Sequence, residues 1–253
     1  MRFVATVESD IGIVKSTNQD SVLLKHASSA VGEVLMAAIC DGMGGLSKGE
    51  LASKTVILEF AKWFDEELPF ELKAFDPEVV AGKWVLMLKD LNHRIGAYGK
   101  QHSVELGTTF TGVLFVGDEY VCVHVGDTRL YYIADSLSQL TEDQTYIARE
   151  IKSGRMTPEE AKVDKRRNVL LQCIGASQSI VPQTFHGRTD RGIYLLCSDG
   201  FRHELTEQEL LENLAPINLV NKKAMHANAE YLIERVKSRR ERDNISVVLI
   251  KAD

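Results

Sequence analysis

The chain carries four short acidic motifs whose aspartates could bind divalent cations. They are NQD ending at Asp20, CDGMGG containing Asp41, CSDG containing Asp199 and RDN containing Asp243. Asp41 directly follows an apolar run, Asp199 follows another after one serine, and Asp243 precedes a third with one asparagine between, so all three are predicted to lie at the ends of buried strands. A fold that gathers these ends places several negative charges together, which is costly unless cations neutralise them. Hard carboxylate ligands of this kind favour Mg²⁺ or Mn²⁺ over zinc.

Apolar runs and helical patterns indicate which elements must position these aspartates. Strand-like runs fall near 3–7, 21–24, 34–40, 109–116, 120–125, 130–133, 180–185, 193–197 and 245–250. Helix-like patterns fall near 49–67, 77–99, 146–153, 206–213 and 222–239, and Ser47 with Glu50 and Thr206 with Glu209 fit capping boxes. Strands come mainly in runs rather than alternating regularly with helices. This order predicts an α+β fold in which helices cover antiparallel sheets.

Length and composition set broad limits on the protein. Its 253 residues allow one large domain or two small ones, and five prolines give no proline-rich linker to divide them. The hydrophobic content of 44% and the charged content of 26% are those of a soluble globular protein. A net charge of −6 argues against nucleic-acid binding and gives no reason to expect attraction to a membrane.

Several features favour a cytoplasmic location. The N-terminal MRFVATVESD lacks the apolar core of a signal peptide, and no apolar stretch approaches the length of a membrane span. Of the four cysteines, none forms a CxxC pair and three lie within strand-like runs. Small buried hydrophobes in a reducing compartment explain these cysteines better than disulfides or metal ligation.

The segment 146–168, termed the flap segment, differs from its neighbours in composition. It is polar, contains Gly154 and Pro158, and carries the basic run KRR at 165–167. It interrupts two strand-rich regions, as a mobile flap over a site would. An ordinary pair of surface helices fits the same composition equally well, so the sequence leaves both interpretations open.

Nine motifs follow one another along the chain. They are GIVKSTNQD (12–20), DGMGG (41–45), GExAS (49–53), GTT (107–109), VGDTRLY (125–131), LTEDQ (140–144), RNVLLQCIG (167–175), CSDG (197–200) and RDNISVV (242–248). In this order they resemble the bacterial metal-dependent protein phosphatases of type 2C, also called the PPM family. The resemblance runs from near residue 9 to near residue 250 and covers essentially the whole chain. It implies a single domain over 1–253, with two stacked antiparallel β-sheets flanked by helices on both sides.

The resemblance also implies a binuclear metal site at one end of the sandwich. Asp41 matches the aspartate that bridges both metals, and Gly42 matches the glycine whose backbone carbonyl holds the first metal. Asp199 and Asp243 match ligands of the second metal, and Asp20 matches the acidic residue that orients metal-bound water. Asp41 and Asp20 are therefore expected to be catalytic.

Three further positions bear on this site. Asp127 matches a residue that, with Asp199, can hold a third metal in bacterial members. Lys15 stands where the family usually has an arginine that grips the substrate phosphate, and we expect it to be catalytic and substrate-binding. A lysine keeps the positive charge but loses the bidentate fork. Met43 stands where eukaryotic members carry a histidine proposed as general acid, and bacterial members commonly have methionine there.

The implied activity is metal-dependent hydrolysis of phosphoserine and phosphothreonine on proteins, in opposition to a Ser/Thr kinase. Two Mn²⁺ or Mg²⁺ ions ~3.5–4 Å apart can generate a bridging hydroxide and clamp the phosphoryl oxygens. The expected partners are phosphorylated proteins and a cognate kinase, with no nucleic acid and no membrane, and the protein is expected to be a monomer. Two other functions stay open. One is a non-catalytic metal-dependent binding module, supported only by Lys15, and the other is a hydrolase of small phosphorylated metabolites.

Five other residues have structural roles in our interpretation. His124 lies in an apolar strand and is expected to be a hydrogen-bonded core histidine. Asn244 is expected to satisfy buried backbone groups next to the site. Thr108 and Thr109 are expected to start a strand. Arg129 either stabilises the aspartate of GDTR by charge pairing or lies on the surface, and the sequence favours neither.

Overall fold

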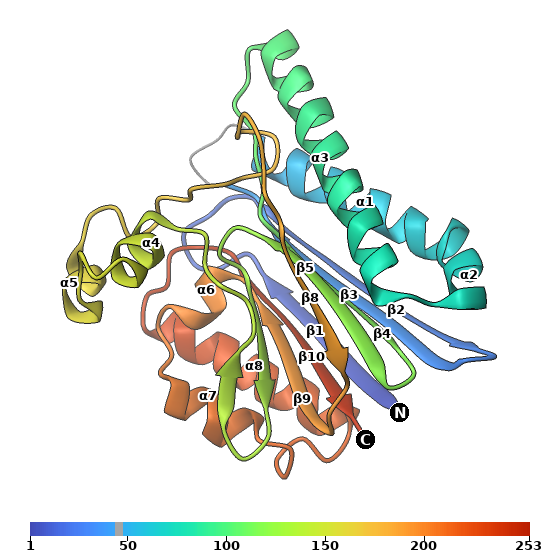
Figure 1. Cartoon of the computed structure of the whole chain (residues 1–253). Coiled ribbons are helices and arrows are strands. Elements are labelled where there is room, and N and C mark those ends of the chain that lie inside the picture. The colour runs from blue at the N-terminus through green and yellow to red at the C-terminus, as the bar shows by residue number, and fades with distance from the viewer. Residues whose placement is uncertain (44–47) are drawn as a thin grey trace.

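The computed structural model describes residues 1–43 and 48–253, and the ten strands within this range form two stacked antiparallel sheets (Figure 1). The first sheet has the order β1–β10–β9–β6–β7 and the second has the order β2–β3–β4–β5–β8. The first consists of β1 (Phe3–Asp10), β6 (Arg129–Ile133), β7 (Leu137–Gln139), β9 (Gly192–Cys197) and β10 (Ile245–Ala252). The second consists of β2 (Asp20–Ser29), β3 (Gly32–Asp41), β4 (Phe110–Val116), β5 (Glu119–Val125) and β8 (Gln183–Arg188).

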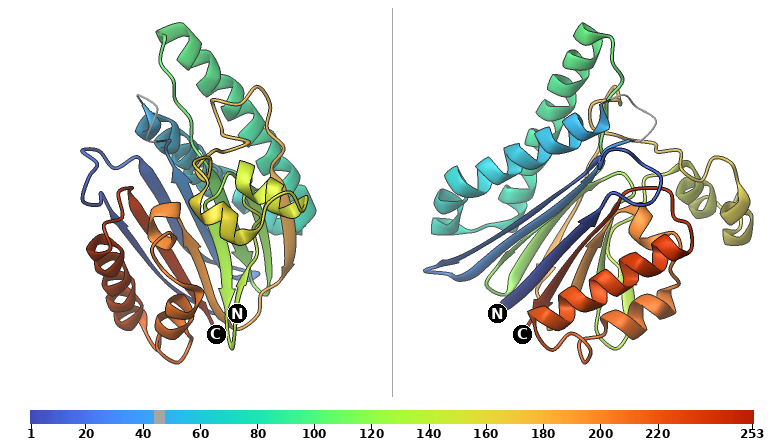
Figure 2. Two further views of the ribbon diagram at one scale, coloured as in Figure 1. Left: turned by 90° about the vertical axis from the view of Figure 1, so that its left-hand side faces the viewer. Right: turned by 180° about the vertical axis from the view of Figure 1, so that it is seen from behind.

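Helices cover the outer faces of both sheets, so the predicted fold class is confirmed (Figure 2). The second sheet is covered by α1 (Gly49–Glu66) and α3 (Pro77–His102), which are joined through α2 (Leu68–Glu71) and η1 (Leu72–Ala74). The first sheet is covered by α6 (Asp199–Arg202), α7 (Glu207–Leu214) and α8 (Lys222–Ser238). In both figures α4 (Tyr146–Lys152) and α5 (Pro158–Val163) stand beside the sandwich. None of the helices in the described residues has the length and apolarity needed to cross a membrane.

Three apolar layers hold the sandwich together. Side chains alternate between the two faces of a strand. In β3, Leu35, Ala37 and Ile39 pack between the sheets, whereas Met36 and Ala38 pack in the layer under α1 and α3. Both faces of this strand are buried, which explains its unbroken apolar run. A third layer lies between the first sheet and helices α7 and α8.

The predicted elements occur at or near their expected positions. The predicted strand at 180–185 is shifted to β8, and the predicted strands at 109–116 and 120–125 form the β4–β5 hairpin through Gly117, whose φ is 60°. The sequence missed β7, α2, η1, α5 and α6, because elements this short show little periodicity. The capping box of Thr206 and Glu209 at α7 is confirmed, whereas Ser47 lies outside the described residues.

Candidate active site

The fold gathers the predicted site aspartates at one end of the sandwich. Asp20 is the first residue of β2 and Asp41 is the last residue of β3, and the two are paired directly across the antiparallel ladder. Asp199 begins α6 just after β9, and Asp243 lies just before β10, the neighbour of β9 in the first sheet. Asp127 lies in the turn between β5 and β6. Strand ends from both sheets therefore supply one cluster.

Burial and the neighbouring negative charges disfavour the charged forms of Asp20, Asp41 and Asp127. Burial raises the pKa of Asp41 well above its usual range, and the charges of Asp20, Asp199, Asp127 and Asp243 raise it further. Burial, followed by the charge of Asp199, likewise raises the pKa of Asp127 to about 7. So dense a group of acids is stable in its ionised form only when cations neutralise it.

Several carboxylate oxygens of this cluster are buried without a partner. Among the described residues, both side-chain oxygens of Asp20 and Oδ1 of Asp199 have no hydrogen-bond donor. Burial raises the pKa of Asp20 to about 7. The nearby hydroxyls of Ser246 and Ser198 lower this pKa, although neither makes a hydrogen bond of normal geometry to the carboxylate. Leaving a buried acceptor unsatisfied costs about 1–3 kcal/mol. Unpaired oxygens that face one cluster fit a hard divalent ion such as Mg²⁺ or Mn²⁺.

The GTT motif fixes the backbone of Asp41. The Asp41 N–H donates to Thr109 Oγ1 at 2.9 Å, and the Asp41 carbonyl accepts from Thr108 Oγ1 at 2.9 Å and from the Thr109 N–H at 2.9 Å. The expectation that these threonines start a strand was wrong, because β4 begins at Phe110. Their hydroxyls instead hold the peptide groups on both sides of the expected bridging carboxylate.

Two glycines of the acidic motifs are required by close backbone approach. A Cβ on Gly42 would lie 2.5 Å from the Gly49 carbonyl oxygen and 2.6 Å from that of Gln19. A Cβ on Gly200 would lie 2.2 Å from the Asn244 carbonyl oxygen. Both contacts are far shorter than van der Waals distance, so only glycine lets these motifs pack. The role of the Gly42 carbonyl as a metal ligand stays a prediction.

Asn244 satisfies backbone groups next to the site, as the sequence predicted, and its bonds tie the loop before β2 to the start of β10. Its Oδ1 accepts from the Gln19 N–H at 2.9 Å. Its Nδ2 donates to the carbonyls of Ile11 at 2.9 Å and Thr17 at 3.2 Å. These bonds hold the loop that carries Lys15 beside the aspartate cluster. The Nζ of Lys15 lies 2.9 Å from Asp243 Oδ1, and the predicted contact of Lys15 with phosphate stays a prediction.

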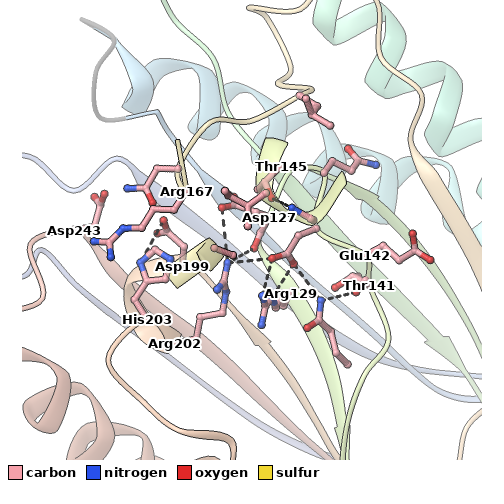
Figure 3. Close-up of a pocket in the computed structure, with 18 of the residues that line it drawn as sticks. Asp127, Arg129, Thr141, Glu142, Thr145, Arg167, Asp199, Arg202, His203 and Asp243 are labelled. Atoms are coloured by element: carbon pink, nitrogen blue, oxygen red, sulfur yellow. Dashed lines mark hydrogen bonds and ion pairs between the residues drawn. The ribbon is translucent and has the colours of Figure 1, made fainter. Parts of the chain in front are cut away.

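Arg129 pairs with Asp143, which answers the question that the sequence left open. Its Nε and Nη2 donate to the two carboxylate oxygens of Asp143 at 2.7 and 2.6 Å (Figure 3). Asp127 is approached instead by Arg202, whose Nη2 donates to the Asp127 carbonyl at 3.2 Å and lies 3.8 Å from Oδ2. Sequence reasoning missed Arg202 and Asp143. One signal was available, since Arg202 follows Asp199 by three residues and helical neighbours at that spacing share a face.

Two histidines near the site differ in environment. His124 is fully buried between Thr111 Oγ1 at 2.8 Å and the Glu142 carbonyl at 3.1 Å, and burial lowers its pKa to about 4, so it is the neutral core histidine that was predicted. His203 was missed by the sequence argument. Its Nδ1 lies 3.8 Å from Asp199 and 4.0 Å from Glu241 (Figure 3).

A pocket of about 1400 Å³ opens beside the aspartate cluster. Asp127, Asp199 and Asp243 line one part of it. The flap segment lines another part through residues that include Ile147, Arg149, Lys152 and Arg167. Arg167 is drawn on the same side of the pocket as Asp243 and Asp199 (Figure 3). The flap segment therefore lies next to the carboxylates.

The chain is similar to several proteins of known sequence. The chain matches the family described as Protein phosphatase 2C over residues 13–236. It is 34% identical over 218 residues to the serine/threonine protein phosphatase PstP of Mycobacterium tuberculosis. This aligned region covers 85% of this chain and 39% of that protein. It is 27% identical over 248 residues to the protein phosphatase PhpP of Streptococcus pneumoniae, and this aligned region covers 96% of this chain and 94% of that protein. The chain thus spans 39% of the first relative and almost all of the second.

Solved structures share the arrangement of the two sheets. The serine/threonine phosphatase of S. agalactiae superposes with a TM-score of 0.87 over 100% of both chains, at 24% sequence identity, which shows the fold alone. The catalytic domain of PstP in complex with two manganese ions superposes with a TM-score of 0.75 at 28% identity, covering 98% of this chain and 97% of that one. The two manganese ions bound by that relative agree with the oxygen-rich cluster found in this chain.

Proposed function

The chain belongs to the protein phosphatase 2C family, and on that premise we propose that it hydrolyses phosphoserine and phosphothreonine esters on proteins with the help of two divalent cations. The observation that carries the proposal is the cluster of Asp20, Asp41, Asp199 and Asp243, whose buried oxygens include three without partners among the described residues. The names of the relatives, serine/threonine protein phosphatase and protein phosphatase, support the substrate class.

The metal ligands in this proposal come from both sheets. Asp41 and the carbonyl of Gly42 would hold one ion, and Asp41, Asp199 and Asp243 would hold the other. A bound pair of divalent ions supplies an activated water at neutral pH and neutralises the charge of the phosphoryl group. Asp41 suits the bridging role because its peptide groups are fixed on both sides by the threonines of the GTT motif.

Two side chains of the chain itself would orient the reactants. Asp20, opposite Asp41 in the β2–β3 ladder, orients the attacking water. Lys15, beside Asp243 on the pocket wall, contacts the substrate phosphate. Water attacks phosphorus, the bond to the serine or threonine oxygen breaks, and that oxygen leaves as a hydroxyl after gaining a proton. The products are inorganic phosphate and the unmodified side chain.

The flap segment has the role of recognising the peptide around the phosphorylated residue. Its support is the shared pocket, which Arg149, Lys152 and Arg167 line together with the aspartates. The substrates of such an enzyme are made by a Ser/Thr kinase, which the phosphatase would oppose as a cytoplasmic monomer. The combined variant Lys152→Gln/Arg167→Gln should change selectivity among phosphopeptides more than hydrolysis of p-nitrophenyl phosphate. Equal changes on both substrates would favour a plain structural role for the segment.

Phosphopeptide hydrolysis with and without a chelator tests the activity. We expect Mn²⁺ or Mg²⁺ to support release of phosphate from phosphoserine and phosphothreonine peptides, and EDTA to abolish it until metal is restored. The same peptide carrying phosphotyrosine measures residue selectivity. Absence of hydrolysis by the metal-saturated protein would point to a binding module. Faster hydrolysis of small phosphorylated metabolites than of any phosphopeptide would point to a metabolite hydrolase.

A further inference from the structure

Arg202 approaches the carboxylate for which the family resemblance predicts a third metal ion. That prediction requires Asp127 and Asp199 to hold the ion together. The guanidinium Nη2 of Arg202 lies 3.8 Å from Asp127 Oδ2 and donates to the Asp127 backbone carbonyl at 3.2 Å. The same nitrogen lies 3.6 Å from Asp143 Oδ2 (Figure 3). A positive charge is therefore already present at Asp127.

The position of Arg202 is determined by a buried network of alternating charge. The side chains of Arg202 and Asp127 are each only 11% exposed, so solvent screens this pair weakly. Asp143 is held on its other side by the two hydrogen bonds from Arg129. The order Asp127, Arg202, Asp143, Arg129 thus places each charge next to one of opposite sign. The charge of Arg202 also lowers the pKa of Asp127, against the larger effect of burial, which raises it.

We propose that the guanidinium of Arg202 is the resident cation of Asp127 and replaces a third divalent ion, so that this chain binds two divalent ions and not three. The inference rests on the proposed metal-dependent function. A divalent ion bound to Asp127 would lie close to the guanidinium, and like charges repel strongly where water is scarce. Removing the positive charge of Arg202 leaves Asp127 and Asp199 as neighbouring acids without that cation. This change should create the third site.

Ion counting combined with anomalous scattering from Mn²⁺ tests the proposal. Direct binding measurements up to millimolar Mn²⁺ should count two ions per wild-type chain, and wild-type crystals soaked in Mn²⁺ should show no manganese at Asp127. Arg202→Gln, which keeps most of the side-chain volume without charge, should raise the count to three and show manganese between Asp127 and Asp199. Arg202→Lys should keep the count at two, and adding Asp127→Asn to the glutamine variant should return it to two.

The unmodified protein alone can overturn the inference, so the test does not depend on a variant that folds. Three manganese ions on the wild-type chain, with one on Asp127, would do so. A folded Arg202→Gln protein that still binds two ions would show that something other than Arg202 prevents the third. A wild-type chain that binds no manganese would overturn the metal assignment together with this inference. Arg188→Gln, which removes an arginine paired with the exposed Asp118, is the matched control and should leave the count unchanged.

Discussion

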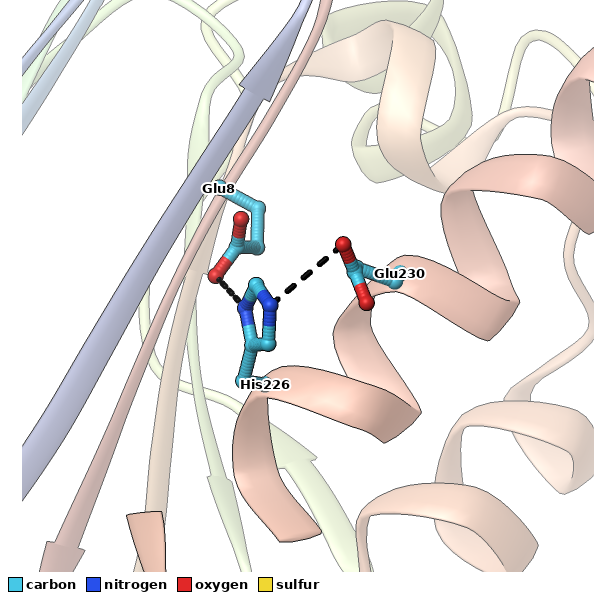
Figure 4. Close-up of side chains that lie close together, drawn as sticks. All are labelled: Glu8, His226 and Glu230. Atoms are coloured by element: carbon cyan, nitrogen blue, oxygen red, sulfur yellow. Dashed lines mark hydrogen bonds and ion pairs between the residues drawn. The ribbon is translucent and has the colours of Figure 1, made fainter. Parts of the chain in front are cut away.

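The aspartate cluster at the end of the sandwich and the cluster of Glu8, His226 and Glu230 on its surface both bring acids together from distant parts of the chain. Glu8 belongs to β1, and His226 and Glu230 lie one turn apart on α8 (Figure 4). The side chains of His226 and Glu230 are 48% and 59% exposed, whereas that of Asp199 is 14% exposed. His226 and Glu230 therefore keep their charges in water, whereas the carboxyl groups of Asp20 and Asp199 are largely removed from it.

The difference distinguishes the proposed metal centre from an ordinary ion-pair cluster. In the surface cluster, His226 Nδ1 hydrogen-bonds Glu8, and Nε2 lies 3.3 Å from Glu230. The imidazole ring of His226 therefore contacts both carboxylates, each through a different nitrogen. The three side chains could also offer ligand atoms to a metal ion, because one such atom from each lies within 4.8 Å of the others. In the aspartate cluster, the oxygens of Asp20 have no such donor among the described residues. The buried, unpartnered oxygens of Asp20 therefore fit an external cation, whereas Glu8 and Glu230 already share the ring of His226.

Replacing Asp41 should have the largest effect on activity, because it alters the aspartate cluster and leaves the surface cluster intact. Asp41→Asn keeps the shape of the side chain but removes the charge that is expected to bridge both ions. We expect kcat/KM on a phosphopeptide at saturating Mn²⁺ to fall by roughly 10³–10⁴-fold, which corresponds to about 5 kcal/mol. The exposed Asp65→Asn is the matched control and should keep full activity. Near-normal turnover by a folded, metal-saturated Asp41→Asn protein would contradict the assignment.

Metal binding should stabilise the protein through the aspartate cluster alone. Ions that bind only the folded state add about 2.7 kcal/mol to the free energy of unfolding at roughly 100 times Kd. Urea unfolding with Mn²⁺ and with EDTA measures this difference. We expect it to be largely lost in Asp41→Asn and retained in Glu230→Gln, which alters the surface cluster. An equal loss in both variants would mean that the two clusters do not differ as proposed.

Lys15 tests how far the positive charge next to the aspartates serves the substrate. If Lys15 contacts the phosphate, Lys15→Ala should raise KM and lower kcat/KM. The lost transition-state stabilisation should be about 1.5–3 kcal/mol, the usual contribution of a hydrogen bond to a charged group. Lys15→Arg should retain or improve activity, because its planar fork can bind two phosphate oxygens. Steady-state kinetics on one phosphopeptide decides the matter. An unchanged kcat/KM in Lys15→Ala would leave Lys15 as the partner of Asp243 only.

The smallest expected effect concerns the surface cluster and depends on pH. The hydrogen bond to Glu8, followed by the charges of Glu8 and Glu230, raises the pKa of His226 above its ordinary value of 6.5. The resulting stabilisation is therefore complete below that value and is lost as the pH rises through the folded-state pKa. His226→Gln should lower the unfolding midpoint at about pH 5.5 and have less effect at about pH 9. A difference in unfolding midpoint between wild type and His226→Gln that does not change with pH would contradict a stabilising ion pair between His226 of α8 and Glu8 of β1.

Local sequence features determined most of the fold. The run VLMAAIC before Asp41 and the run ISVVLI after Asp243 predict buried strands because, apart from Ser246, their side chains are apolar on both faces. Knowledge of how the sheets and helices pack was not needed for this step, since each motif adjoins its strand in the chain. The resemblance then predicted that Asp20, Asp41, Asp199 and Asp243 meet, and the register of β2 with β3 brings the first two together.

Tertiary structure alone decided which charged groups became partners. Arg129 is two residues from Asp127, yet it pairs with Asp143, whereas Arg202 reaches Asp127 from a separate helix. The hydroxyls of the GTT motif likewise hold Asp41 from more than sixty positions away in the chain. Such pairings depend on how loops from two sheets meet at one end of the sandwich. Apolar periodicity is a property of neighbouring residues and can be read from the sequence, but the partner of a buried charge is chosen by its surroundings in space.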